Sequence, residues 1–406
     1  MRARSSKSNK DPLKLKNSWP RIGILGGGQL ARMLVEASHE LGMDVRVFCE
    51  SDTEPAPQVT PRFYIGSIKD KSNKDLLSFF EKVDLVTFES EFVSVEVIED
   101  LLKENPSLAS RLNFFPKLAV MRELQDRKSQ KQFLRDHKLP TSEDLEPLVL
   151  EAKGPWTPLV LKKRQGGYDG YGTFIFKQRA SLEKWMAKQL RDVSLSRRDF
   201  IQKNFIVEKW IPFCRELAFS MARDRSGQTV TLPLVETHQL QSRCDWVCGP
   251  VQHPRFRSLE RKIKSALEDL DYVGIIAFEL FDTGKDLLIN EVAPRVHNSA
   301  HHSQESMVLS QFDLHLLCST EHGLPSESRL RGSFAMLNLL GTCPTQIPAA
   351  RAQLTGKLHW YGKTEARPGR KMGHINYISQ SKINIKSLLK ERQLHLPHQM
   401  EKPSES

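Results

Sequence analysis

Hydrophobic and polar positions first become regular at residues 21–25, a short apolar run that ends in Gly26-Gly27-Gly28. Apolar residues then recur at helical spacing until Gly42, which stands where a helix C-cap is expected. Further apolar runs at 44–49 and 83–88 predict two more strands. A strand, a glycine turn, a helix and a strand form a βαβ unit, so we expect an open parallel sheet in this part of the chain.

The pattern changes at Pro116. A polar helix over 118–137 leads into many strand-like apolar runs, which only two further helical stretches interrupt. Many strands with few helices are typical of an α+β domain with a largely antiparallel sheet. The expected strands are 159–162, 173–177, 205–210, 216–222, 229–235, 274–281 and 286–292, and the expected helices are 180–191 and 257–270.

A third part of the chain follows Gly323-Leu324-Pro325, with strand-like runs at 334–340 and 357–378 around a short helix. The last ~20 residues are polar, which predicts a loose end. The fold class is therefore α/β combined with α+β. We expect a basic flexible leader (1–19), an N-terminal parallel-sheet domain (20–115), a central domain (116–325), a small β-rich C-terminal domain (326–385) and a flexible tail (386–406).

Composition narrows the class of protein. The 406 residues suggest about two to four domains, and 39% hydrophobic residues suit globular domains with sizeable cores. No apolar stretch approaches the ~20 residues that cross a bilayer, which excludes an integral membrane protein. Six scattered cysteines without a CxxC pair argue against a disulfide scaffold and a zinc ribbon, and they favour a reducing cytoplasm.

Basic residues outnumber acidic ones by 60 to 49, and much of this surplus lies at the N-terminus. The first 20 residues contain six Lys or Arg and one Asp. A basic leader on a near-balanced body argues little for nucleic acid, so we expect neither a nucleic-acid nor a membrane partner. Because the leader has no apolar core it is not a secretory signal, and we interpret it as disordered, with an organelle presequence as the alternative.

Two glycine clusters are typical of phosphate sites. The first, 26–31, fits G-x-G-x-x-A after a strand, with Glu50 and Asp52 roughly 20 residues further on. It predicts a phosphate ligand at a helix N-terminus, in a dinucleotide or otherwise, with a tight turn as the alternative. The second places Lys162 at the end of a strand, before a flap with four glycines within 166–172. Such a backbone can fold over a triphosphate while Lys162 contributes a point charge.

Glu279 and Glu291 lie on consecutive predicted strands, among apolar residues where carboxylates are costly unless they meet cations. Together with the amide oxygen of Asn290, they are hard ligands suited to Mg²⁺. The strand register decides whether they can act together. If Asp282 pairs with Lys285 across a two-residue turn, the glutamates face opposite sides of the sheet, whereas an odd-length turn or a bulge places both on one face.

His297, His301 and His302 follow the second glutamate closely. Three histidines within six residues suggest transition-metal ligands, but nothing else near them has zinc spacing. We interpret the segment as a substrate-facing loop in which His297 transfers or orients a proton, and His302 as part of a solvated loop. Cys244 and Cys248, with two histidines nearby, form another candidate metal cluster.

Together these motifs resemble the ATP-grasp ligases, and among them the 5-(carboxyamino)imidazole ribonucleotide synthase family of purine biosynthesis. The likeness covers nearly everything from residue 21 to residue 375. It implies an ATP-grasp fold with a Rossmann-like N-terminal domain, and a homodimer. The matching segments are 23–30, 125–127, 162, 166–172, 206–208, 215–217, 279, 290–295, 297–299, 310–312, 359–363 and 367–374.

Enzymes of this family use ATP and Mg²⁺ to activate bicarbonate as carboxyphosphate, and then carboxylate the exocyclic amine of aminoimidazole ribonucleotide. The resemblance therefore implies an ATP-dependent carbon–nitrogen ligase, with Mg²⁺ held by Glu279 and Glu291. It implies catalytic roles near bicarbonate and the imidazole for Asp169, Arg295, His297 and Lys363. It implies ATP contacts for Arg127, Lys162, Gly167, Tyr168, Asp169, Gly170, Gly172, Glu208, Lys209, Trp210, Ile211, Glu216, Gln239, Asn290 and Glu291. It implies ribonucleotide contacts for Gly28, Gln29, Leu30, Glu89, Glu91, Tyr168, Asn298, Ser299, Lys363, Arg370 and Lys371.

Several residues depart from the family pattern, and they lie on the acceptor side. Tyr171 stands where the flap usually has Lys or Arg, and Phe92 stands where Asn is usual. Gln239 replaces a usual His, for which His238 could substitute only if the backbone shifts. Residues 241–248 replace an apolar Gly-Ile-Leu run.

These departures keep other functions open. One is an ATP-grasp ligase with a different acceptor, and another is a diverged nucleotide-binding regulatory protein with little turnover. A nicotinamide oxidoreductase would use the first glycine cluster but would leave the second unexplained. For the leading function the predicted partners are small molecules, namely bicarbonate and aminoimidazole ribonucleotide.

Overall fold

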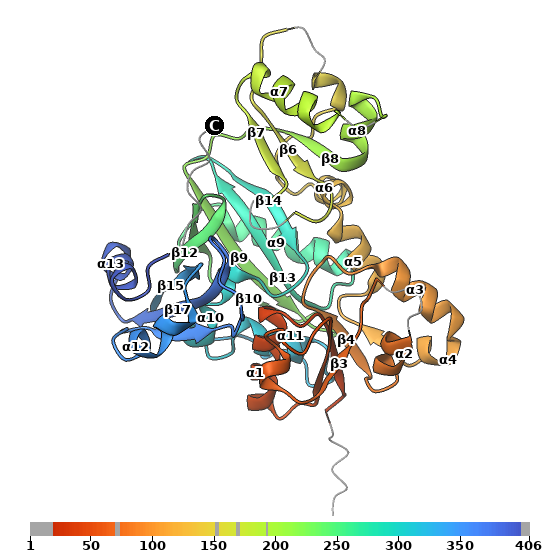
Figure 1. Cartoon of the computed structure of the whole chain (residues 1–406), viewed down its shortest axis with the longest axis vertical. Helices are drawn as coiled ribbons and strands as arrows, with labels where there is room; N and C mark the ends of the chain where they lie inside the picture. Colours follow the sequence, from red (N-terminus) through yellow and green to blue (C-terminus); the bar gives the residue numbers. More distant parts are fainter. Residues whose placement is uncertain (1–18, 70–73, 151–153, 168–170, 192–193, 399–406) are drawn as a thin grey trace, which may run out of the picture.

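The computed structural model describes residues 19–69, 74–150, 154–167, 171–191 and 194–398 (Figure 1). Within these ranges the chain forms one sheet of five strands, one of nine and one of three. No helix there is both long enough and apolar enough to cross a membrane. Nearly all of the predicted basic leader lies outside the described residues.

The N-terminal part folds into the predicted parallel sheet, with strand order β3-β2-β1-β4-β5. Helix α1 ends at Gly42, whose left-handed backbone (φ 66°) suits glycine. The glycine turn therefore lies at the carboxyl end of β1, the edge at which open α/β sheets bind ligands. The elements are β1 (Ile22–Leu25), α1 (Gln29–Leu41), β2 (Val45–Cys49), β3 (Phe63–Ile65), α2 (Lys74–Phe80), β4 (Leu85–Phe88), α3 (Val95–Glu104), α4 (Pro106–Ala109) and β5 (Asn113–Phe114).

The single helix predicted over 118–137 is wrong, because two helices occupy this segment. Helix α5 (Leu118–Gln125) and helix α6 (Arg127–Asp136) are separated by Asp126, whose backbone is extended. The Asp126 carboxylate accepts hydrogen bonds from the backbone N–H groups of Lys128 and Ser129, so it caps α6. The break therefore gives α6 its own capped N-terminus, which begins at Arg127.

A small lobe contains the antiparallel sheet β7-β6-β8 and two helices (Figure 1, top). Its helix α8 was not predicted, because only Phe200 and Ile201 are apolar in it and they are adjacent, which gives no helical spacing. The capping side chain of Ser196, which accepts from Asp199 N–H, is the local signal for its start. The elements are β6 (Leu159–Lys163), β7 (Thr173–Phe176), α7 (Arg179–Gln189), α8 (Arg197–Asn204) and β8 (Phe205–Lys209).

The large antiparallel sheet has the order β14-β13-β9-β11-β12-β15-β17-β16, and β10 pairs with β9. Pairing of β12 with β15 joins the central and C-terminal parts of the chain in one continuous sheet. Helix α11 contacts both β9 and β13. The elements are β9 (Arg215–Arg223), β10 (Thr229–Thr231), β11 (Val235–Leu240), β12 (Arg243–Gly249), α9 (Phe256–Asp269), β13 (Gly274–Asp282), β14 (Leu287–Ala293), α10 (Ser303–Ser306), α11 (Gln311–Cys318), β15 (Ser333–Leu340), α12 (Ile347–Arg351), β16 (Lys357–Trp360) and β17 (Lys371–Ser379).

Part of the segment predicted as a flexible tail (386–406) forms helix α13 (Ile385–His395), and residues 399–406 lie outside the described residues. Asn384 caps the helix by accepting from the Ser387 N–H. The helix is held by Arg392, a buried residue whose Nη1 lies 2.7 Å from a carboxylate oxygen of Asp245 on β12. A polar composition was therefore misleading here, because one buried ion pair fixes the helix to the large sheet.

Candidate active site

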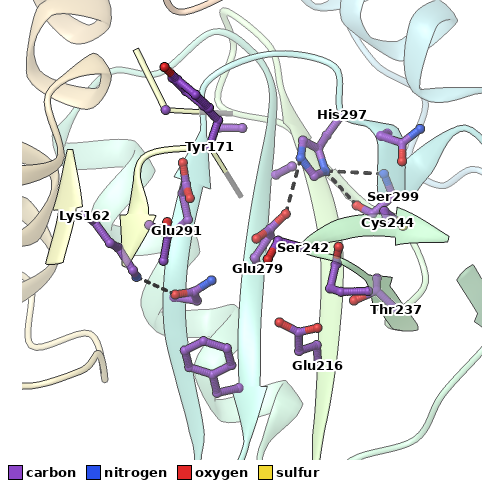
Figure 2. Close-up of a pocket in the computed structure, with 18 of the residues that line it drawn as sticks. Lys162, Tyr171, Glu216, Thr237, Ser242, Cys244, Glu279, Glu291, His297 and Ser299 are labelled. Carbon is purple, nitrogen blue, oxygen red and sulfur yellow. Dashed lines mark hydrogen bonds and ion pairs between the residues drawn. The ribbon is translucent and has the colours of Figure 1, made fainter. Parts of the chain in front are cut away.

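A cavity of about 790 Å³ opens where the small lobe, the large sheet and the N-terminal sheet meet. Strands β6, β9, β11, β13 and β14 contribute side chains to it, as do the segments that follow β4, β8 and β14. Figure 2 shows Glu279 and Glu291 near each other on the large sheet, with Lys162 across from Glu291 and His297 beside Glu279. The cavity therefore collects most of the candidate residues predicted from separate motifs.

Glu279 and Glu291 are direct partners across β13 and β14, and the register shifts just after Glu279. Asp282 pairs with Leu287, so without this bulge the two glutamates would face opposite sides of the sheet. The extra residue in β14 is Asn290. The structure thus has the irregularity that the predicted common face requires.

Burial raises the pKa of the Glu279 carboxyl to about 7, and the nearby charge of Glu291 adds to the shift. On the other side of the pair, Arg127 Nη2 lies 2.5 Å from Glu291 Oε1. The two carboxylates thus lie close together and open into the cavity, with side chains that are 38% (Glu279) and 30% (Glu291) exposed. A hard divalent cation suits this donor set, so the residues present fit Mg²⁺.

Lys162 points into the cavity from β6 and is almost fully buried. Its Nζ lies 2.7 Å from Glu208 Oε2 and donates to Asn290 Oδ1 at 2.7 Å. The second oxygen of Glu208 lies 2.6 Å from Nζ of Lys131 on α6. Sequence reasoning missed Lys131, although it lies four residues after Arg127 and therefore on the same face of a helix.

Helix α6 is fixed to the sheet that carries the glutamates. The Gln130 side chain donates to Val292 O at 2.8 Å and accepts from Val292 N–H at 2.9 Å. Arg127 also donates to the carbonyl of Lys163 at 2.9 Å. These contacts hold Arg127 in the lining of the cavity, while Lys131, on the same face of α6, contacts Glu208.

The end of β8 and the residues after it also line the cavity. They are Lys209, Trp210 and Ile211, and Glu216 of β9 lines the cavity with them. In the flap, a Cβ on Gly167 would approach Arg127 Nη1 to 2.4 Å, so a larger residue there would displace the Arg127 guanidinium group. The flap residues Tyr168, Asp169 and Gly170 lie outside the described part of the chain.

Glu216 provides a test of burial in the ligand-free site. Burial raises the pKa of its carboxyl to about 7. A folded-state pKa above the unfolded value means that the folded protein holds this proton more tightly, and the stability this gives is lost as the pH rises through about 7. We expect Glu216→Gln to match the wild-type unfolding temperature at pH 5 and to exceed it at pH 8. Differential scanning calorimetry at both pH values checks this, and a variant that melts lower than the wild type at pH 8 would contradict it.

The loop after β14 is held by two buried contacts. Arg295 forms a bidentate ion pair with Glu91 from the N-terminal domain, and Arg295 Nη2 lies 3.0 Å from Glu91 Oε1. Burial opposes the charged form of Glu91, but Arg295 outweighs it and lowers the pKa of the carboxyl. The Gln311 side chain accepts from His297 N–H at 2.8 Å and donates to His297 O at 2.9 Å.

The His297 ring lies between two of the candidate residues. Its Nδ1 is 2.9 Å from Ser299 Oγ, and its Nε2 is 3.5 Å from Glu279 Oε1. The neighbouring Asn298 exchanges two side-chain hydrogen bonds with Asn338 of β15. His297 is therefore oriented at the edge of the carboxylate pair.

The first glycine cluster is used differently from the expected phosphate site. The N–H groups of Gly28 and Leu30 donate to the Glu89 carboxylate, at 2.6 and 3.2 Å. Burial outweighs these hydrogen bonds and raises the pKa of Glu89. The Glu89 carboxylate thus occupies the N-terminus of α1, where an anionic ligand was predicted. Gln29, the first residue of α1, lines the cavity.

Cationic side chains for an anionic group come from the C-terminal strands instead. Lys371 lines the cavity, and Lys363 donates to the Lys371 carbonyl at 2.7 Å. Arg370 donates to Glu365 O at 2.9 Å and is not among the residues that line the cavity. The cavity thus contains Lys371 directly and has Lys363 next to it.

The departures from the family pattern lie around the cavity. Tyr171 and Phe92 both line it, and both side chains are exposed. The pairing of β11 with β12 shifts between His238 and Gln239, and the extra residue of this bulge is Asp245 on β12. The His238 ring stacks flat on Trp246, with ring centres 5.2 Å apart, and borders the cavity.

The interpretation of His302 as part of a solvated loop is wrong. Its ring stacks on Phe334 of β15 at 3.9 Å and is buried. His301 is buried as well, 5.1 Å from the ring of His374. Both histidines pack between the central and C-terminal parts of the chain. Among the described residues no group of three or more His, Cys, Asp or Glu side chains is arranged to hold a metal ion.

Family models match three successive parts of the chain. The ribonucleotide synthetase pre-ATP-grasp domain matches residues 20–116, and the ATP-grasp domain matches residues 141–312. The phosphoribosylaminoimidazole carboxylase C-terminal domain matches residues 335–387. The matches follow the order of the three sheet-containing parts expected from the sequence.

Relatives match over most of the chain. An N5-carboxyaminoimidazole ribonucleotide synthase of Synechococcus elongatus is 34% identical over 87% of this chain and 88% of its own. The crystal structure of N5-carboxyaminoimidazole ribonucleotide synthetase from Thermus thermophilus has a TM-score of 0.76 and 32% identity, covering 95% of this chain and 100% of that one. The Aspergillus clavatus synthase in complex with ADP and 5-aminoimidazole ribonucleotide has a TM-score of 0.76 and 27% identity, covering 93% and 97%.

Proposed function

Because the chain belongs to the family of N5-carboxyaminoimidazole ribonucleotide synthases, we propose that it carboxylates 5-aminoimidazole ribonucleotide at the expense of ATP, as a ligase of purine biosynthesis. The observation that carries this proposal is the content of one cavity. It joins Lys162, the carboxylate pair and Lys371, the first residue of β17. A nucleotide and a phosphorylated acceptor can therefore bind side by side.

Phosphoryl transfer to bicarbonate requires positioning and charge stabilisation more than covalent chemistry by the protein. In the proposed reaction Lys162 and Arg127 hold the phosphates of ATP, and residues 209–211 border the base. Glu279 and Glu291 would hold Mg²⁺, which neutralises charge on the phosphates when it is bound. The resulting carboxyphosphate hydrolyses readily, so a flap that closes over it excludes water.

The acceptor lies between the N-terminal and C-terminal parts of the chain in this proposal. Lys371 and Lys363 supply positive charge for the ribonucleotide phosphate, and Gln29 and Glu89 border the sugar. His297 lies within reach of Glu279 and Ser299, so it can hold or move a proton at the amine being carboxylated. We also propose a homodimer in the cytoplasm.

Phosphate release from ATP tests the function. We expect release to depend on both 5-aminoimidazole ribonucleotide and bicarbonate, with each omitted in turn as the control. Chromatography of the product identifies the carboxylated ribonucleotide. A protein that binds ATP but releases no phosphate with both substrates present would exclude the proposed reaction.

A second candidate function is a ligase of the same fold with a different acceptor. The observation that favours it is the pair of exposed aromatic side chains, Tyr171 and Phe92, that line the cavity. A screen of phosphorylated amines for ADP formation separates the two functions.

Tyr171 also provides a direct test of the altered flap. Lys163 Nζ lies 4.9 Å from the centre of its ring. If the aromatic residue weakens anion binding near bicarbonate, Tyr171→Arg restores a cation, and we expect bicarbonate-dependent turnover to rise by about threefold to tenfold, or ~1 kcal/mol. Steady-state phosphate release at limiting bicarbonate measures this. A clear drop would show instead that Tyr171 has a role of its own, for which Tyr171→Phe is the control.

A further inference from the structure

We propose that Lys131 is a positioning residue for nucleotide binding, which neutralises Glu208 so that the charge of Lys162 stays available to the phosphates. The inference rests on the proposed function, because it assumes that the cavity binds ATP. Lys131 does not line the cavity, whereas Lys162 and Glu208 do. Its effect on a ligand would therefore be exerted through Glu208.

The three side chains form a buried row of alternating charge. Lys131 Nζ lies 2.6 Å from one Glu208 oxygen, and Lys162 Nζ lies 2.7 Å from the other. Side-chain exposures are 4% for Lys131, 2% for Glu208 and 7% for Lys162. At such depth water screens the charges little, so the net charge of the row acts on whatever binds next to it.

The Lys131 ammonium group is fully engaged by protein acceptors, two of which, Ser142 and Glu208, also line the cavity. It lies 2.5 Å from Thr141 Oγ1 and 2.6 Å from Ser142 Oγ, in addition to Glu208. These three acceptors match the three donors of a lysine. Lys162, in contrast, has two partners among the described residues, Glu208 and Asn290, which leaves one donor for a ligand.

Counting charges shows what Lys131 contributes. Two lysines and one glutamate give the row a net charge of +1. Burial disfavours the charged form of Glu208, but the two lysines outweigh it and lower its pKa to about 2, so the carboxylate stays ionised. Without Lys131 the row would be neutral, because Glu208 would cancel Lys162 alone.

A purely structural role would not need these charges. Replacing a buried ion pair by apolar residues is often neutral or stabilising, whereas removing one partner leaves a buried charge without compensation. Folding alone therefore explains the extra buried cation of Lys131 poorly, whereas a phosphate ligand at Lys162 explains why it is there.

Calorimetric titration of the whole chain with ADP and with adenosine tests the inference. We expect Lys131→Met to weaken ADP binding roughly tenfold or more, because a unit charge is lost within a poorly screened site. Adenosine, which has no phosphate, should bind equally to both proteins. Lys128→Met is the matched control, since Lys128 is exposed on the same helix. Failure of the wild type to bind ADP would count against the proposed function, whereas unchanged ADP binding by Lys131→Met would overturn this inference.

A double variant separates charge from structure. Lys131→Met with Glu208→Gln returns the row to +1, carried by Lys162 alone, so it keeps the wild-type net charge without the Lys131–Glu208 ion pair and tests the charge even if Lys131→Met alone does not fold. Dividing the adenosine dissociation constant by the ADP dissociation constant removes any loss of base contacts at Glu208. We expect this ratio in the double variant to stay within about threefold of the wild-type ratio. In Glu208→Gln alone we expect a ratio higher than in the wild type. A double variant whose ratio falls tenfold would overturn the inference.

Discussion

Glu291→Gln is expected to reduce ATP turnover by about a thousandfold or more. A bound metal ion stabilises transition-state charge by on the order of several kcal/mol, and each ~1.4 kcal/mol changes a rate tenfold. Gln keeps the shape of the side chain but removes the charge that a divalent cation needs. Phosphate release at saturating ATP and varied Mg²⁺ measures the loss.

The same substitution has two opposite effects on the ligand-free fold. It relieves the repulsion by which Glu291 raises the pKa of Glu279, and it removes the carboxylate from Arg127, whose Nη2 lies 2.5 Å from Glu291 Oε1. Because Gln can still accept a hydrogen bond from Arg127, we expect the unfolding temperature of Glu291→Gln to stay close to that of the wild type. Asp286→Asn, which changes an exposed carboxylate in the turn of the same hairpin, is the control and should keep full activity. Turnover that survives Glu291→Gln would contradict the metal assignment.

The parts of the fold that the sequence predicts are those with a local cause. The parallel N-terminal sheet follows from an apolar run, a glycine turn and a helix with a regular apolar face, all within a few turns of chain. The positions of Glu279 and Glu291 on adjacent strands were predicted in the same way. Their common face was left conditional, because a one-residue bulge is not visible as a pattern in the residues themselves.

The parts that the sequence did not predict depend on contacts between distant segments. Helix α13 was predicted as a loose tail because Asp245, the partner that holds Arg392, lies 147 residues away in the sequence. His302 looked solvated because Phe334, which covers it, belongs to another part of the chain. Lys131 is one polar residue in a polar helix, and its importance is visible only once Glu208 lies beside it.

Of the irregularities in strand pairing that lie at the cavity, two lie on either side of β9. One aligns Glu279 with Glu291, and the other lies beside His238 and Gln239. Bulges re-aim side chains at the cost of regular pairing, so they are expected at sites with a function. The second bulge is in the hairpin that departs from the family, and the Asp245 that it displaces is the residue to which α13 is attached.

Arg392→Met is expected to destabilise the region around β12 and α13 by about 3–5 kcal/mol, because it leaves the buried Asp245 carboxylate without its main cation. Arg392 also donates to the Asn338 carbonyl at 3.2 Å, and that contact is lost too. Urea unfolding measures the loss, and amide hydrogen exchange in β12 and α13 shows where it occurs. Lys390→Met, on the exposed side of the same helix, is the control and should change the urea midpoint little.

The pH dependence of this loss identifies its cause. His398 Nε2 lies 2.9 Å from the same Asp245 oxygen, and burial, together with the charge of Arg392, lowers the pKa of its ring. Removing Arg392 lets the pKa of His398 rise, so a protonated His398 can replace the missing charge as the pH falls below its ordinary value of about 6.5. The loss should therefore be larger at pH 8 than at pH 6. An equal loss at both values would mean that packing of the Arg392 side chain, rather than its charge on Asp245, holds the helix in place.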